Sequence, residues 1–175
     1  MRQPFRLLTS LTLLILSPFT QADLVNSSTA NIEFTVNIVT WSCTISTSSQ
    51  DITVNLGDYP DYYFKSAGQT TPAKYFSISL SDCNNTSVTT TFSGTADSAN
   101  SHYLALNSNS TAKNIAVEIL DNDKTALPLN TESAAVTVDS SGSATLGFWA
   151  NYISTADSIT GGSADADATF TINYY

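Results

Sequence analysis

Hydrophobic and polar residues alternate along most of the chain, with the period of two that is typical of half-buried β-strands. Ser, Thr and Asn fill the outward positions, and turn-forming Asp, Asn and Gly residues separate the alternating stretches. No stretch has a helical period, so the pattern predicts an all-β sandwich of one domain. The inward members of the stretches are Ile52, Val54 and Leu56; Phe76, Ile78 and Leu80; Val88, Thr90 and Phe92; Ile115, Val117 and Ile119; Leu146, Phe148, Ala150 and Tyr152; Phe170, Ile172 and Tyr174.

The alternation changes phase near the N-terminus. Apolar residues first occupy even positions over residues 32–38 and then odd positions over residues 39–45. A slip of one residue turns every side chain to the other face of a strand, so we expect two separate strand segments. The first belongs to an N-terminal extension, residues 23–38, and the second begins the folded domain, residues 39–175. The apolar side chains of the first segment are Ile32, Phe34, Val36 and Ile38.

A strand with one apolar face needs a partner in water. Full burial of four such side chains stabilises a fold by at most about 6–12 kcal/mol. The strand could fold back onto its own domain, or it could add itself to the open sheet edge of another molecule. The alternation is compatible with both arrangements.

The first residues have the plan of a secretory signal peptide. Arg2 and Arg6 precede an apolar run over residues 7–16, and Ala22 ends a stretch that a signal peptidase recognises. The run is shorter than the roughly 20 apolar residues that cross a bilayer. We therefore expect residues 1–22 to be cleaved, and we expect no membrane insertion of the mature chain.

The net charge bears on the binding partners of the chain, and the cysteine count bears on whether it contains a disulfide. The chain has 6 Lys and Arg against 15 Asp and Glu, a formal net charge of −9, which disfavours binding to nucleic acid or anionic lipid. Its two cysteines, Cys43 and Cys83, have no metal-binding spacing. In an exported chain they predict one disulfide.

The sequence offers no catalytic constellation. The only histidine, His102, lies in a polar stretch with loop character, and a nucleophilic triad needs a base close to its nucleophile. The Asp121-Asn122-Asp123 run lacks the Gly and Glu of a calcium loop, which favours a hairpin turn. We predict a protein that is not an enzyme and that needs no cofactor or metal.

Several segments, in order, resemble the type 1 fimbrial pilin family of the chaperone–usher pathway. Residues 76–83, FSISLSDC, are similar to the strand before the family's second cysteine, and residues 92–97, FSGTAD, to the segment that follows it. Residues 114–121 with 127–129 resemble the central hairpin of the family. Residues 166–175, ADATFTINYY, resemble the C-terminal strand, and Gly162 stands where the family carries a glycine.

The resemblance implies a fold and a mechanism. The family has an incomplete immunoglobulin-like β-sandwich that a donor strand from another chain completes. A periplasmic chaperone fills the gap first, and a neighbouring pilin subunit's extension replaces it at an outer-membrane usher. By position, Ile32, Phe34, Val36 and Ile38 would be the donor side chains. The acceptor groove and chaperone edge would comprise Gly162, Phe170, Ile172, Tyr174 and Tyr175, with the Tyr175 carboxylate anchored by the chaperone.

The resemblance predicts a structural subunit of an extracellular fimbria that contributes to bacterial cell adhesion. Val36 departs from it, because the family usually has glycine seven positions before its first cysteine. This valine and the polar surface favour a minor or adaptor subunit. The alternative function is a self-contained secreted carbohydrate-binding or adhesive β-sandwich, in which residues 31–38 complete their own sheet.

Overall fold

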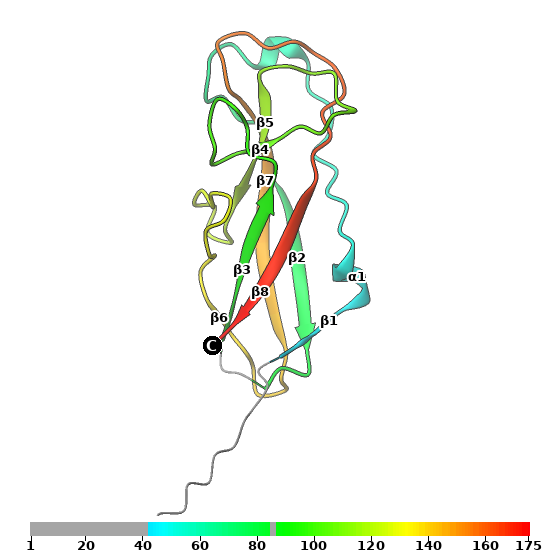
Figure 1. Ribbon diagram of the computed structural model, residues 1–175, viewed down its shortest axis with the longest axis vertical. Helices are drawn as coiled ribbons and strands as arrows, with labels where there is room; N and C mark the ends of the chain where they lie inside the picture. Colours follow the sequence, from blue (N-terminus) through cyan, green and yellow to red (C-terminus); the bar gives the residue numbers. More distant parts are fainter. Residues whose placement is uncertain (1–41, 85–86) are drawn as a thin grey trace, which may run out of the picture. The chain divides into compact units, whose positions relative to one another are not determined.

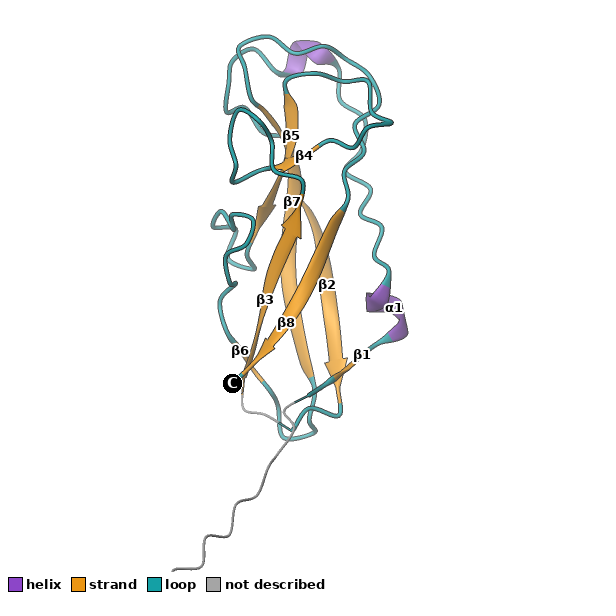
Figure 2. Cartoon of the chain, viewed as in Figure 1, coloured by secondary structure: helices purple, strands orange, loops and turns teal. Residues whose placement is uncertain are grey.

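The computed structural model describes residues 42–84 and 87–175, which form two antiparallel β-sheets packed against each other (Figures 1 and 2). The predicted signal peptide, the donor segment and Trp41 lie outside the described residues. All pairings between neighbouring strands are antiparallel. The all-β sandwich predicted from the alternation is therefore confirmed.

The larger sheet has five strands and the smaller sheet has three. In spatial order, the larger sheet contains β1 (Thr44–Ile45), β2 (Lys74–Ser81), β7 (Ala144–Ser154), β5 (Ile115–Leu120) and β4 (Leu104–Ala105). The smaller sheet contains β6 (Val136–Thr137), β3 (Ser87–Gly94) and β8 (Ala168–Tyr174). The C-terminal strand β8 is thus an edge strand that pairs only with β3.

The core lies between the two sheets, where the predicted inward residues of the long strands meet. Ile78, Val88 and Leu146 are almost completely buried. Phe76, Phe92 and Phe148 form an aromatic triangle with ring centroids 6.0, 5.6 and 4.9 Å apart, within the range of favourable aromatic pairs. This triangle connects β2, β3 and β7, and so joins one sheet to the other.

Two features differ from the predicted strands. Residues 51–57 alternate as a strand does, with Ile52 and Val54 half-buried and Leu56 buried, but they have no strand ladder. Two short helical turns, α1 (Thr47–Gln50) and η1 (Asp61–Tyr63), were not predicted, because each is a single local turn without an apolar face. Among the described residues, no helix is long and apolar enough to cross a membrane.

A disulfide joins Cys43 to Cys83, as the cysteine count predicted. The bridge ties the segment before β1 to the segment after β2, and the Cys83 N–H also donates to the Gly142 carbonyl at 2.9 Å. Thr44 and Ile45 pair with the last residues of β2. The two-residue strand β1 is therefore held in place by a covalent bond next to a short ladder.

We expect the double substitution Cys43→Ser/Cys83→Ser to lower the free energy of unfolding by about 4 kcal/mol, because the bridge closes a loop of 40 residues. Urea denaturation of the oxidised protein and of the variant measures this loss. Dithiothreitol should reproduce it in the parent chain and leave the variant unchanged. Equal stability of the two proteins would contradict the structural role of the bridge.

Candidate functional site

The outer edge of β8 carries backbone groups without a ladder partner. Ser87 and Tyr175 exchange both of their backbone hydrogen bonds, at 3.1 and 2.9 Å. Hydrogen-bonded and non-hydrogen-bonded pairs alternate along an antiparallel ladder, so odd-numbered residues of β8 bond to β3. The N–H and C=O groups of Ala168, Phe170, Ile172 and Tyr174 therefore point away from β3, and none of them bonds on that side to a described residue.

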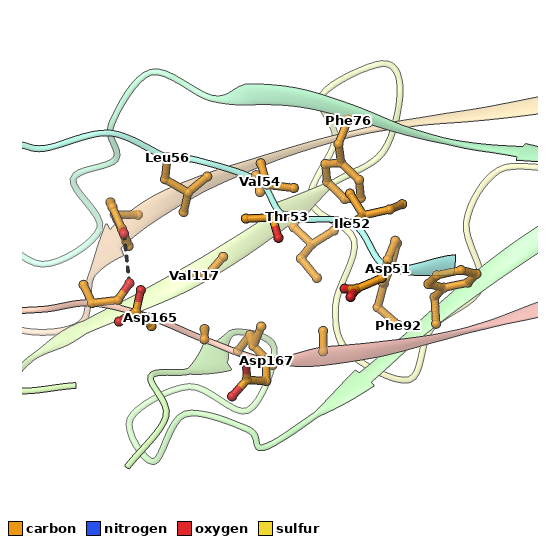
Figure 3. Close-up of a pocket in the computed structure, with 18 of the residues that line it drawn as sticks. Asp51, Ile52, Thr53, Val54, Leu56, Phe76, Phe92, Val117, Asp165 and Asp167 are labelled. Atoms are coloured by element: carbon orange, nitrogen blue, oxygen red, sulfur yellow. Dashed lines mark hydrogen bonds between the residues drawn. The ribbon is translucent and has the colours of Figure 1, made fainter. Parts of the chain in front are cut away.

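A second unpaired stretch lies across from this edge. Residues 52–56 form no backbone hydrogen bond with any described residue. Their apolar side chains nevertheless point inward, and Figure 3 shows Ile52, Val54 and Leu56 along one side of a depression. The alternation is thus that of a strand, although none of the residues that the structure describes pairs with this stretch.

A groove of about 460 Å³ lies between the two unpaired stretches. Its floor comes from both sheets: Phe76 from β2, Phe92 from β3, Val117 and Ile119 from β5, Ala150 and Tyr152 from β7. A dry apolar cavity of about 150 Å³ holds one benzene-sized group. The groove has about three times that volume.

One end of the groove is fixed by polar contacts. The Tyr152 hydroxyl donates to the Ala164 carbonyl at 2.8 Å, so β7 reaches across to the segment that precedes β8. Burial raises the pKa of Tyr152, and the nearby carboxylates of Asp165 and Asp58 raise it further. Asp165 and Asp167 lie on the rim of the groove on the β8 side, and Asp51 lies on the other side (Figure 3).

The structure places the predicted acceptor residues along β8, though not all of them in the groove. Phe170 lines the groove. Ile172 and Tyr174 are half-buried and pack against the core, further along the same strand. Tyr175 continues the ladder with Ser87, and its hydroxyl donates to a Glu132 carboxylate oxygen at 2.7 Å. This contact raises the pKa of Tyr175.

Gly162 does not line the groove. It is exposed and packs closely against the loop before β5: a Cβ at this position would lie 2.3 Å from Thr111 Oγ1 and 2.6 Å from the Ala112 nitrogen. The neighbouring Thr160 and Lys113 form an isolated β-bridge. Gly162 therefore permits a close approach between two loops near the end of the groove.

Most of the groove floor was not predicted from the sequence. The alternation at Val117, Ile119, Ala150 and Tyr152 is that of any core residue, so nothing in the sequence marks these residues as the lining of a groove. The alternation over residues 52–56 was a sequence signal close to the groove. It predicted a strand there, and the structure shows that this segment pairs with neither sheet.

The titratable groups with shifted pKa values do not meet in one site. Burial raises the pKa of Glu118 on β5, where Asn151 of β7 is its cross-strand partner. Hydrogen bonds within their own turns lower the pKa values of Asp123 and Asp139. His102 is exposed in a loop. Within residues 42–84 and 87–175, no three His, Cys, Asp or Glu side chains lie close enough to hold a metal ion.

The Asp121-Asn122-Asp123 run is a hairpin turn, as interpreted from the sequence. The Lys124 N–H donates to the Asp121 carbonyl at 2.9 Å, and Lys124 adopts a positive φ of 66°. The Asp121 carboxylate accepts from the backbone N–H groups of Asn122 and Ala134 at 2.7 and 2.6 Å. Its oxygens are therefore engaged in fixing the turn.

A family model, a related sequence and two solved structures that match this chain are all from fimbrial or pilus proteins. The family model described as "Fimbrial protein" matches residues 32–175. The fimbrial-like protein FimF of Salmonella typhimurium is 42% identical over 162 residues, which cover 91% of this chain and 92% of that protein.

Solved structures with the same fold include the type I fimbria protein BPSL1626 of Burkholderia pseudomallei, with a TM-score of 0.61, 32% identity, and coverage of 75% of this chain and 88% of that one. The P pilus rod subunit PapA has a TM-score of 0.65 at 20% identity, with coverage of 76% and 99%, and shows the fold alone. The predicted fold class, an incomplete immunoglobulin-like β-sandwich, is confirmed.

We expect Gly162→Ala to lower the free energy of unfolding by about 1–3 kcal/mol, because the added methyl group would overlap the backbone of Ala112. Gly161→Ala is the matched control, since nothing lies within 4 Å of a Cβ there. Denaturant unfolding of both variants measures the difference. Equal effects at the two positions would show that the close approach is not required.

Glu118→Gln should stabilise the protein at neutral pH. The raised pKa of Glu118 means that its charged form is disfavoured in the folded state, so folding stability falls as pH rises through this pKa. Glutamine stays neutral and avoids that loss. Urea unfolding at pH 7 and at pH 3.5 should show an advantage for the variant that disappears in acid. An advantage of equal size at both pH values would rule out ionisation as its cause.

Proposed function

The chain belongs to the family of fimbrial proteins and is a structural subunit of a pilus, and we propose that it polymerises by accepting a neighbouring subunit's β-strand in the groove beside β8. The observation that carries this proposal is the pair of backbone stretches without a ladder partner among the described residues. These are the outer edge of β8 and residues 52–56, and they lie on either side of a groove with an apolar floor. One inserted strand would satisfy both stretches and fill the groove.

Strand insertion combines two sources of affinity. Backbone ladder bonds along β8 are independent of the inserted sequence, whereas alternate side chains that enter the groove fix its register. The acceptor residues are Phe170, Ile172 and Tyr174, whose backbone groups face the open edge and whose side chains face the core. Gly162 contributes indirectly, by holding the loop at one end.

The donor in this proposal is the chain's own N-terminal segment, offered to the next subunit. Ile32, Phe34, Val36 and Ile38 alternate with polar residues, as a strand entering a one-sided groove requires. Val36 is bulkier than the glycine usual in the family. The proposal therefore requires that the groove receiving this segment has room for a branched side chain at that point.

An open edge above an apolar groove is also an aggregation hazard. We propose that a periplasmic chaperone covers β8 after export, with the Tyr175 carboxylate as its anchor, and that an outer-membrane usher is where the neighbouring subunit replaces it. The finished polymer is an extracellular fimbria on the bacterial surface that contributes to cell adhesion. Its role is structural rather than catalytic.

The test is thermal unfolding of residues 39–175, which lack the donor segment, with and without a peptide of residues 28–39. We expect the peptide to raise the unfolding temperature by about 10 °C. Each kcal/mol of stabilisation shifts the unfolding temperature of a domain of this size by about 2–4 °C, so this rise corresponds to about 2.5–5 kcal/mol. A peptide with Phe34→Asp is the matched control and should have little effect, because a carboxylate cannot be buried cheaply.

A domain that is already stable and monomeric, and that gains nothing from the peptide, would contradict polymerisation by strand insertion. It would favour the self-contained β-sandwich instead. A domain that is unstable in both conditions would mean that the groove takes a different subunit's strand.

A further inference from the structure

The rim of the groove carries acidic side chains: Asp165 and Asp167 lie on the β8 side, and Asp51 lies on the other side, beside Ile52 (Figure 3). Three of its lining residues are aspartates, Asp51, Asp165 and Asp167, and the lining contains no Lys or Arg. All three side chains are exposed, and none forms an ion pair within the described residues. The Asp167 carboxylate accepts one hydrogen bond, from Asn107 Nδ2 at 3.0 Å. Negative charge therefore remains beside the opening.

The alternation of side chains decides what meets these carboxylates. Along the segment before β8, Ala164 and Ala166 are half-buried, whereas Asp165 and Asp167 are exposed. Across the groove, Asp51 is exposed and Ile52 points inward. A strand lying between these segments directs its apolar side chains into the groove and its other side chains outward. At the end of the groove nearest Ala164, those outward side chains lie next to Asp165 and Asp167.

We infer that this acidic rim is a specificity element: the groove accepts a neighbouring pilin's strand whose outward residue at the Asp165–Asp167 end is neutral or basic, and it rejects one that is acidic there. The inference rests on the proposed function. Like charges on adjacent strands repel, and opposite charges attract. The carboxylates thus add a charge requirement to the apolar requirement of the floor.

The requirement constrains how this chain's own segment can be received. Glu33 is the only charged residue between residues 31 and 39, and the other outward positions are Thr35 and Asn37. Repulsion keeps Glu33 away from Asp165 and Asp167. If a copy with this groove receives this segment, Asn37 is then the outward residue at the Asp165–Asp167 end.

The test measures binding of labelled peptides of residues 28–39 to the exported chain, residues 23–175, by fluorescence anisotropy at low salt. We expect Asn37→Lys to bind about tenfold more tightly than Asn37→Glu. Glu33→Gln is the matched control and should change the affinity less than twofold. The chain's own extension competes equally with every peptide, so it cancels in these ratios.

Two further measurements assign the effect to the rim. The ratio should shrink towards one in the Asp51→Asn/Asp165→Asn/Asp167→Asn variant. It should also shrink in 1 M salt, where the screening length is about 3 Å. A charge effect at residue 33 in place of residue 37 would support the selective rim with the strand running in the opposite direction.

A ratio below about twofold at both positions, with the unmodified peptide still binding, would overturn the inference and leave strand insertion intact. The same holds for a ratio that persists in the triple variant. If no peptide binds in any condition, the proposed function fails for this donor, and the selectivity inference fails with it.

Discussion

Strand β8 pairs with β3 along one edge and with none of the described residues along the other. A strand with one paired and one unpaired edge leaves N–H and C=O groups that need water or another chain. Here the unpaired edge borders an apolar groove, so water can satisfy the backbone but not the groove. Phe76, Phe92 and Phe148 bind the two sheets together beneath this opening. The sandwich is therefore held at its centre and incomplete at one side.

Contacts at several positions hold the segments that border this incomplete side. The disulfide fixes the chain just before β1, and residues 52–56 follow without any ladder of their own. At the other side, the Tyr152 hydroxyl holds the Ala164 carbonyl, and Gly162 lets its loop approach Thr111. The β8 side of the groove is thus positioned by contacts at one end of the groove.

The sequence predicted what depends on local periodicity and missed what depends on pairing. The alternation identified β2, β3, β5, β7 and β8, because a half-buried strand has the same pattern wherever it pairs. The same pattern at Ile52, Val54 and Leu56 predicted a strand, but these residues form no ladder with the described residues. The alternation reports which side chains are buried and does not report whether a strand has a neighbour. Gly162 was associated with the groove by resemblance. Its contact with Ala112 comes from tertiary packing that no local pattern encodes.

Charge gives the groove a second property besides its shape. A protein that exposes an apolar groove and an unpaired strand risks pairing with any extended chain, including further copies of itself. The net charge of −9 makes copies repel each other at long range. The rim aspartates act in the same sense at short range, since they oppose a strand with the wrong outward charge. Because backbone bonding is the same for every sequence, discrimination must come from side chains. The floor selects by size and the rim by charge. The same carboxylates then have two effects: they disfavour binding of unrelated extended chains in the open groove, and they select among the strands that can bind there.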